Sequence, residues 1–273
     1  MTAVAAPDVG ARDPAGPALA FRQTLSLSRR AVISTLRKPA AFVPGLFFPL
    51  LMAAVYSSQF DRVTATPGFP EVDSFLQFIL PATILQGVAF GSTIGGVEMA
   101  QDIESGFFDR LTSAPVARPA IFLSRVAGSA AFAAVEALIL IGVLTAFGAR
   151  VSAGFGGVAA IVVISVFLAV ALGGFGLAIA IRSGNAEVVQ GIFPAIFALL
   201  FVSTAFFPPS LMKGWFRVIA EANPVSTVID AMRHLVIVGW STAEFGKAIA
   251  VLVAISAVSL SLAYSQYRHR VKA

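Results

Sequence analysis

Cysteine is absent from the 273-residue chain, which excludes disulfides, thiol nucleophiles and metal sites built on thiolates. Histidine is scarce, because only His234 and His269 are present, too few for a metal site built on imidazoles. Charge is also scarce: Asp, Glu, Lys and Arg make up 12% of the residues, whereas a typical soluble domain carries about 25%. With 58% apolar residues and a mean hydropathy of +0.88, the composition indicates a protein embedded in a lipid bilayer.

Apolar runs of about 20 residues recur along the chain, which is the length a helix needs to cross a bilayer. The runs are continuous rather than alternating, which favours helices over a β-barrel. We therefore predict an all-α membrane protein whose transmembrane domain spans residues 39–270. Its six transmembrane helices are expected at about residues 40–59, 74–97, 119–147, 153–181, 186–207 and 245–267.

The residues ahead of the first span divide into two parts. Residues 1–17 are rich in Ala, Pro, Gly and Asp, which predicts a disordered tail rather than a signal peptide. Residues 18–38 combine an apolar face with five basic residues, which predicts an amphipathic helix at the membrane surface. A solvated basic leader is the alternative interpretation of residues 18–38.

Lys and Arg are distributed unevenly between the two sides of the predicted bundle. Thirteen fall on the side that carries both termini and residues 98–125, and six fall on the other side. Positive charge accumulates on the cytoplasmic side of membrane proteins, so both termini and residues 98–125 are expected in the cytoplasm.

The segment between the second and third spans, residues 98–125, is unusually rich in charge, with four acids and three arginines. Phe107, Phe108 and Leu111 have the i, i+3 and i+4 spacing of an apolar helix face. Pro115 limits the C-terminal end of such a helix. We predict a short amphipathic helix that forms a docking surface for a partner in the water phase.

A long segment, residues 208–244, separates the last two spans. Its first half predicts a short helix, because charged residues recur at steps of four: Lys213, Arg217 and Glu221. The Asn223–Pro224 pair ends this helix, and residues 225–238 are expected to form a second one. We predict a helical hairpin that enters the outer leaflet and returns. A seventh span over residues 225–240 is the alternative, but it would be short and would carry three ionisable side chains.

No nucleotide-binding loop is found in the sequence. A P-loop needs a glycine-rich turn that ends in Gly-Lys-Ser/Thr, whereas the only Gly-Lys pair, Gly246–Lys247, is followed by Ala248. If the protein uses ATP, a separate polypeptide must bind it. An intramembrane enzyme is disfavoured, because the spans hold no nucleophile–base pair and no metal set.

Two residue types recur at steps of four inside the spans. Glycine does so in the second span, at Gly87, Gly91 and Gly95. These glycines let another backbone approach closely, either at a dimer seam or in static packing within one subunit. Phenylalanine does so in the fifth span, at Phe193, Phe197 and Phe201. This stripe could line the path of an apolar solute, face lipid or pack in the core.

Polar residues also lie deep within the predicted spans. Glu136 falls in the third span, where a carboxyl group is costly and usually faces protein or water. It could contact a solute or handle protons, or it could be a hydrogen-bonded packing residue. Gln86 in the second span could line the same path or bond one helix to another.

Taken in order, these features resemble the ABC-2 type permeases, and most closely the membrane subunits of daunorubicin-resistance-like drug exporters. The resemblance covers about residues 21–267. Its most specific part is residues 102–115, which look like the family's Glu-x-Gly…Leu…Pro segment after the second span. A second family signature, before the last span, is matched by Asn223, Pro224, Asp230 and Arg233.

The resemblance implies that the segment after the second span is a coupling helix, which sits in a cleft of an ATPase subunit. The residues expected to make this coupling are Asp102, Glu104, Gly106, Phe107, Phe108, Arg110, Leu111 and Pro115. Many family members carry more basic residues just before the Glu-x-Gly, whereas this chain has Gln101 and Asp102 there.

The resemblance further implies two permease copies, expected as a homodimer, with two copies of a separate ABC ATPase. ATP and Mg²⁺ would bind to the ATPase, and this chain would need no cofactor, metal or nucleic acid. The expected location is the bacterial plasma membrane, and the phenylalanine stripe favours a hydrophobic cargo such as a drug, an antibiotic or a lipid-like compound. An exporter of polysaccharide or lipid-linked sugar and an ion-coupled secondary transporter are the alternatives.

Overall fold

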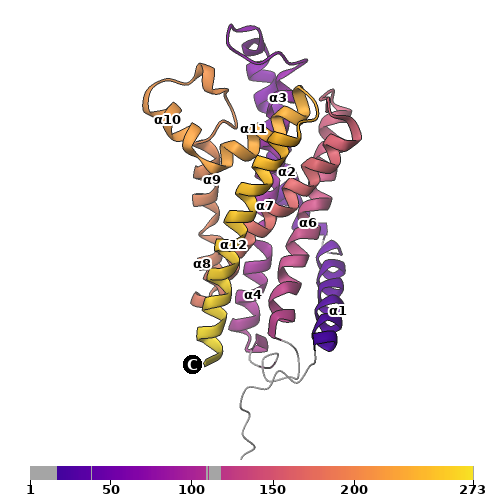
Figure 1. Cartoon of the computed structure of the whole chain (residues 1–273), viewed down its shortest axis with the longest axis vertical. Helices are drawn as coiled ribbons and strands as arrows, with labels where there is room; N and C mark the ends of the chain where they lie inside the picture. The colour runs from indigo at the N-terminus through magenta and orange to yellow at the C-terminus, as the bar shows by residue number, and fades with distance from the viewer. Residues whose placement is uncertain (1–16, 38, 109, 111–117, 273) are drawn as a thin grey trace, which may run out of the picture.

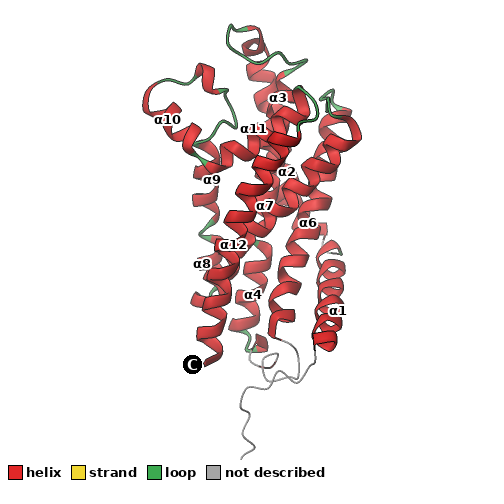
Figure 2. Cartoon of the chain, viewed as in Figure 1, coloured by secondary structure: helices red, strands yellow, loops and turns green. Residues whose placement is uncertain are grey.

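A computed structural model describes residues 17–37, 39–108, 110 and 118–272 of the chain. Every regular element within these residues is helical, as the all-α prediction requires (Figure 2). The longest helices run side by side along the long axis of the molecule (Figure 1). Leu111, Pro115 and all but the last residue of the predicted tail lie outside the described residues.

Five helical segments of the described chain are long and apolar enough to cross a membrane. They are α2 (Pro39–Phe60), α3 (Phe75–Ser92) together with α4 (Ile94–Glu104), α6 (Arg118–Ala146), α7 (Gly154–Ser183) and α12 (Thr242–Lys272). Five of the six predicted spans are thus confirmed as long apolar helices, and the fifth span differs.

The predicted fifth span, residues 186–207, is not one continuous helix. It is divided into α8 (Ala186–Gln190) and α9 (Phe193–Phe201), which together are shorter than the other spans. Pro194 explains the break, because it has no amide hydrogen to donate to the carbonyl of Gln190, four residues earlier. Helix α9 also ends at Phe201, six residues before the predicted boundary.

The second predicted span is also interrupted, and it extends beyond its predicted end at residue 97. The hydroxyls of Ser92 and Thr93 donate to the backbone oxygens of Ala89 and Phe90, each at 2.9 Å. Such local bonds compete with the helix ladder and bend helices. Helix α4 then continues to Glu104, so Glu98, Asp102 and Glu104, which are predicted to follow the second span, lie on its helical continuation.

Shorter helices mark the two ends of the molecule (Figure 1). Helix α1 (Pro17–Leu36) lies beside α6 at the end where the C-terminus is found, which we call the α1 end. Helices α10 (Gly214–Ala222) and α11 (Pro224–Ile237) lie at the opposite, α10 end. Two 3-10 turns, η1 (Asp61–Ala65) and η2 (Pro209–Leu211), complete the described elements. Helices occur within residues 18–38 and 208–244, whereas their positions at the membrane surface and in the outer leaflet stay predictions. The alternative of a seventh span is not supported, because α11 has only 14 residues.

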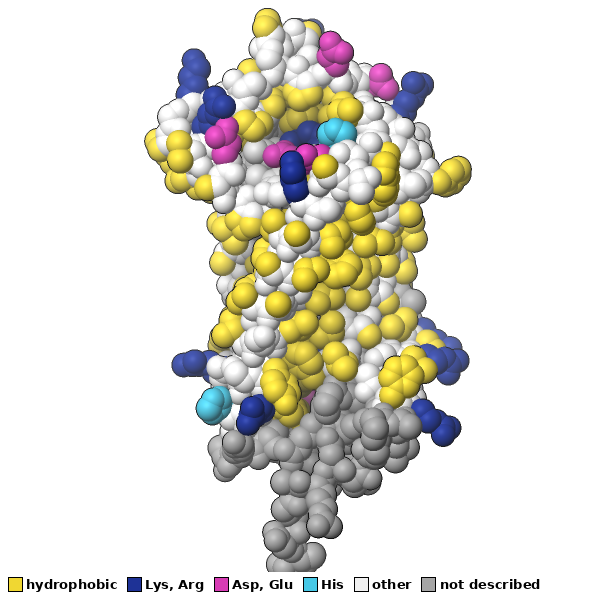
Figure 3. Space-filling view, in the orientation of Figure 1, with side chains coloured by type: hydrophobic (Ala, Val, Ile, Leu, Met, Phe, Trp, Pro, Cys, Tyr) yellow, Lys and Arg dark blue, Asp and Glu magenta, His cyan; other side chains and the backbone are white. Residues whose placement is uncertain are grey.

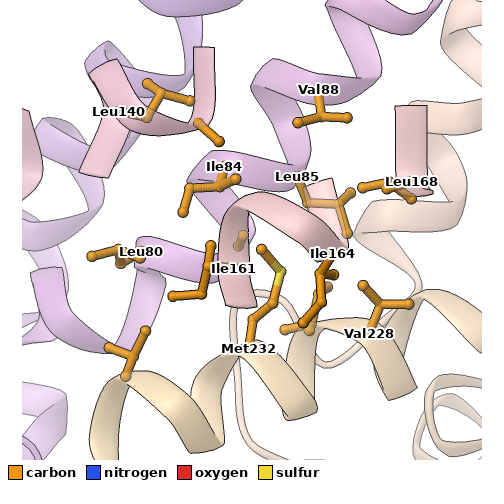
Figure 4. Packing of buried hydrophobic residues seen from close by; sticks show 14 of the residues in the cluster. Leu80, Ile84, Leu85, Val88, Leu140, Ile161, Ile164, Leu168, Val228 and Met232 are labelled. Atoms are coloured by element: carbon orange, nitrogen blue, oxygen red, sulfur yellow. The ribbon is translucent and has the colours of Figure 1, made fainter. Parts of the chain in front are cut away.

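Helix α3 is the centre of the fold, because most of its residues are buried. Its side chains pack against α6, α7 and α11 (Figure 4). The residues at these contacts are Leu80, Ile84, Leu85, Val88, Leu140, Ile161, Ile164, Leu168, Val228 and Met232. Helix α11 therefore packs into the hydrophobic core from the α10 end.

The surface has the pattern of a protein that crosses a bilayer. A broad apolar band crosses the middle of the visible face, and Lys and Arg gather toward the two ends of the molecule (Figure 3). Large aromatic side chains are exposed in helices and turns of the α10 end: Phe147, Phe155, Trp215 and Trp240. Aromatic residues are enriched at membrane–water interfaces. The chain is a multi-pass membrane protein.

Candidate functional site

A row of aromatic rings follows α9 and crosses to α2 and α3; we call it the aromatic ladder. Its members are Phe48, Tyr56, Phe90, Phe193, Phe197, Phe201 and Phe206. The ring centroids of Phe90 and Phe193 lie 4.1 Å apart, and those of Phe193 and Phe197 lie 5.3 Å apart. Phe201 continues the row 5.0 Å from Phe197, and Phe206 lies 4.8 Å from Phe201. The predicted stripe on α9 is therefore joined by rings of α2 and α3 that no sequence pattern singles out.

A cavity lies toward each end of the aromatic ladder. The cleft nearer the α1 end has a volume of about 430 Å³ and is lined by Pro44, Gly45, Phe90, Thr93, Ile94, Val97, Glu98, Gln190 and Phe193. The cavity nearer the α10 end has a volume of about 230 Å³ and is lined by Tyr56, Phe60, Phe75, Phe201, Ser203, Phe206, Phe207, Met212 and Phe216. Ladder residues line both cavities, so the row of rings extends from one cavity to the other.

Two of the three helices that carry the ladder, α2 and α9, are poorly covered by the rest of the chain. Most of α2 is not buried, in contrast to α3. Val43, Phe47 and Leu51 form an exposed apolar stripe at steps of four on α2, and Leu199 is exposed on α9. A large exposed apolar surface on a membrane protein faces either lipid or another protein subunit.

Glu136 is fully buried in a notch formed by three glycines of α2 and α3, and it is not among the residues that line the two cavities, although Gly45 of this notch lines the cleft nearer the α1 end. A Cβ atom on Gly45 would collide with its carboxylate, and a Cβ on Gly87 would lie 3.3 Å from its Cδ. A Cβ on Gly91 would lie 3.0 Å from its Oε2. Neither carboxylate oxygen has a hydrogen-bond partner among the described residues. This geometry agrees with the packing alternative, and contact of Glu136 with a solute stays a prediction.

The predicted glycine face of α3 and α4 is covered by α6 of the same chain. A Cβ on Gly87 would approach Leu140 Cδ1 to 2.7 Å, and a Cβ on Gly95 would approach Ser129 Oγ to 2.7 Å. This placement matches the alternative of close packing within one subunit. Gln86 is buried as well and lines neither cavity, and its Oε1 has no partner among the described residues.

Asn223 of the second signature connects α9 to α11. Its side-chain amide donates to the backbone oxygens of Leu199 and Val202 at the end of α9, both at 2.7 Å. Its Oδ1 accepts a hydrogen bond from the amide of Val225 at 2.9 Å and so caps the start of α11, where Pro224 occupies the first turn. One side chain therefore supplies hydrogen-bond partners for backbone groups at two helix ends, where no partner within the helix is available.

Asp230 and Arg233 of the same signature hold the chain that leaves α9. Arg233 donates to Asp230 Oδ1 and to the backbone oxygen of Thr204, both at 2.8 Å, and its guanidinium lies 4.0 Å from the ring centroid of Phe78. Asp230 also accepts from the Thr204 hydroxyl at 2.8 Å. Burial lowers the pKa of Arg233 to about 10 and raises the pKa of Asp230, which the charge of Arg233 opposes. Arg233 thus stays charged at neutral pH and connects the chain at the α10 end of the ladder to α3 and α11.

The acids of the predicted coupling segment make contacts within this chain. Arg125 of α6 pairs with Glu98, at 2.7 Å, and with Asp102. Glu104 Oε1 accepts a hydrogen bond of 2.9 Å from the amide of Ala186, the first residue of α8. Sequence reasoning missed both partners, because they lie more than 20 residues away along the chain.

The residues after Glu104 divide into buried and exposed ones. Gly106 has a φ of +69°, a conformation that favours glycine. Phe108 is buried against the ring of Tyr267 of α12, whereas Phe107 is 44% exposed and Arg110 is exposed. No group of three His, Asp or Glu side chains in the described part of the chain could hold a metal ion.

Known proteins resemble this chain over most of its length. The daunorubicin resistance ABC transporter permease protein DrrB1 of Streptomyces coeruleorubidus is 27% identical over 259 residues, which is 93% of this chain and 88% of the relative. A probable doxorubicin resistance ABC transporter permease protein, DrrC of Mycobacterium tuberculosis, is 25% identical over 77% of this chain and 75% of its own. A putative transport permease, ycf38 of Cyanophora paradoxa, is 28% identical over 79% of this chain and 74% of its own. The model of the ABC-2 type transporter family matches residues 22–237, and the chain belongs to that family.

Proposed function

We propose that this chain is the membrane subunit of an ATP-driven exporter of hydrophobic small molecules, such as drugs, antibiotics or lipid-like compounds. The observation that carries the proposal is the aromatic ladder, which joins an apolar cleft near the α1 end to an aromatic cavity near the α10 end. Aromatic rings attract flat apolar molecules by stacking and by burial of apolar surface. Two relatives are named as permeases of daunorubicin and doxorubicin resistance transporters, which supports a cargo of this kind.

In the proposed arrangement, the α1 end faces the cytoplasm of a bacterial cell and α10 with α11 lies in the outer leaflet. The uneven distribution of Lys and Arg supports this orientation. Helices α8 and α9 together make the sixth crossing, and the ladder makes that crossing suitable for a solute. Cargo enters the α1-end cleft from the cytoplasm or the inner leaflet and leaves past the aromatic cavity.

Two copies of the chain associate, most simply as a homodimer, through the exposed faces of α2 and α9. The exposed stripe of Val43, Phe47 and Leu51 supports this interface. A separate ABC ATPase, in two copies, binds ATP and Mg²⁺ and contacts this chain at Phe107 and Arg110. The exposure of these two side chains supports their role as contacts, whereas Asp102 and the exposed Glu104 have partners within this chain.

The test is transport of a hydrophobic fluorescent dye into vesicles that contain the purified chain with the ATPase that remains bound to it. Uptake is expected to require ATP and Mg²⁺. Phe197→Ala removes the ring between Phe193 and Phe201. Stacking of one such ring on the dye is worth about 0.5–1.5 kcal/mol, so uptake is expected to fall roughly 2- to 10-fold. The matched control is Phe155→Ala, because Phe155 is 97% exposed, is not a member of the ladder and lines neither cavity.

Three results would contradict the proposal: absence of a bound ATPase, uptake that a proton or sodium gradient drives without ATP, or equal uptake by Phe197→Ala and Phe155→Ala. Selective uptake of a lipid-linked sugar with no uptake of the dye would favour the carbohydrate exporter instead.

A further inference from the structure

We infer that Glu104 is a positioning residue, which ties the segment around residues 105–110 to α8 and thereby to the aromatic ladder. The inference rests on the proposed function, because the motion that Glu104 would transmit is that of the transport cycle. It assigns the carboxylate of the Glu-x-Gly signature a partner within this chain instead of a contact with a separate ATPase.

The first observation is the set of acceptors for the opening amides of α8. Glu104 Oε1 accepts from the amide of Ala186 at 2.9 Å, across 82 residues of sequence. The side chain of Asn185 accepts from the amides of Glu187, at 2.8 Å, and Val188, at 3.1 Å. The amides of the first three residues of α8 are therefore all satisfied, and Glu104 supplies the acceptor that comes from another helix. Hydrogen bonds to charged groups are stronger than neutral ones.

The second observation is that α4 and α8 pack without slack around this bond. A Cβ on Gly96 of α4 would lie 2.8 Å from the backbone of Gly176 and 3.0 Å from Val189 Cγ1 of α8. A Cβ on Gly184 would lie 3.0 Å from Ile103, the residue before Glu104. Close packing of this kind transmits a displacement instead of absorbing it.

The third observation is what α8 leads to. Seven residues after Ala186 the chain reaches Phe193, the first ladder residue of α9, and Gln190 at the end of α8 lines the α1-end cleft. Asn223 links the far end of α9 to α11. A shift of Glu104 is therefore passed through α8 and along α9 as far as Leu199.

The experiment uses the absence of cysteine from the chain, which allows single spin labels without removal of native residues. One label is placed at Ser105→Cys, next to Glu104, and another at Leu199→Cys on α9; both residues are exposed. The labelled chain is purified with its bound ATPase, and the electron paramagnetic resonance spectrum is recorded with Mg²⁺ and either ADP or a non-hydrolysable ATP analogue. Each label is measured in the unaltered chain and in Glu104→Ala, Glu104→Gln and Glu187→Ala.

We expect the ATP analogue to change the spectra of both labels in the unaltered chain. Glu104→Ala should keep the amount of bound ATPase and the response at residue 105, but lose the response at residue 199. Dye transport should then fall at least about 5-fold, the lower end of typical coupling between sites. Glu104→Gln should preserve the response at residue 199, because its amide oxygen accepts the same hydrogen bond. Glu187→Ala is the matched control, because it removes an exposed carboxylate of α8 that makes no hydrogen bond or ion pair with the described residues of α4.

The inference is overturned if Glu104→Ala keeps the response at residue 199, or if it lowers the amount of bound ATPase, since the latter result would make Glu104 a contact with the partner. Failure of the proposed function has a different signature: the unaltered chain would then retain no ATPase, or neither label would respond to the ATP analogue.

Discussion

At the scale of single residues, the fold depends on glycines that make room for larger neighbours. Glu136 occupies the space that side chains at Gly45, Gly87 and Gly91 would need. Sequence analysis identified two of these glycines and Glu136 as separate features, but their combination in one notch follows from the packing of α2, α3 and α6. Gly142, on the same helix as Glu136, has no atom within 4 Å of an added Cβ.

Substitution in this notch should destabilise the protein through overpacking. We expect Gly45→Ala and Gly91→Ala each to cost about 1–3 kcal/mol, because the added methyl meets the Glu136 carboxylate or the Phe132 ring. Gly142→Ala is the control and should be neutral or slightly stabilising, since alanine favours helices. The measurement is the thermal unfolding of the detergent-purified chain. Equal midpoints for Gly45→Ala and Gly142→Ala would contradict the packing.

Replacement of the Glu136 carboxylate by an amide should leave transport nearly unchanged. Because it lines neither cavity, Glu136→Gln is expected to leave ATP-dependent dye transport within about 2-fold of the unaltered chain, as for a residue without contact to the solute. The measurement is dye uptake over a panel of hydrophobic dyes. A selective loss of some dyes would instead place Glu136 in contact with the solute.

At the scale of elements, the segment formed by α8 and α9 has polar contacts at both of its ends. Glu104 binds the first amide of α8, and Asn223 and Arg233 bind the chain at and after the end of α9. The two segments that sequence motifs singled out for different reasons thus fix the two ends of one aromatic element. This arrangement explains why an element of 16 residues, broken at Pro194, keeps a defined position beside longer helices.

The double role of Asn223 can be separated by substitution. Asn223→Asp keeps an oxygen that caps α11 but removes the amide that donates to Leu199 and Val202. We expect a loss of about 1–3 kcal/mol from two part-buried acceptors left without their donor. Hydrogen exchange should speed up at the end of α9 and remain slow in the first turn of α11. Equal loss of protection in both helices would show that capping, rather than the bridge to α9, is the main role.

At the scale of the whole molecule, α2 is the long helix with the least cover. Two copies are expected to meet on this side, so a single cysteine at Phe47, which is 65% exposed, should cross-link between copies in native membranes. Leu138→Cys on α6 is the control, because Leu138 is 51% exposed on a helix outside the expected interface. The measurement is the dimer fraction after mild oxidation. Cross-linking of Leu138→Cys that equals or exceeds that of Phe47→Cys would move the interface away from α2.

Local patterns are enough to predict the membrane class, five of the six expected spans and the two short helices before α12, because hydrophobic length and proline or glycine positions act over a few residues. The same local patterns singled out the Glu-x-Gly segment, the second signature and the phenylalanine stripe. Which of these residues meet depends instead on how the helices pack. Glu104 with Ala186, Arg125 with Asp102, Asn223 with Leu199 and Glu136 with Gly45 are pairs distant along the chain, and helix packing brings them together. No periodicity encodes such pairs, because a helical repeat specifies which face of a helix is apolar and not which neighbour covers it.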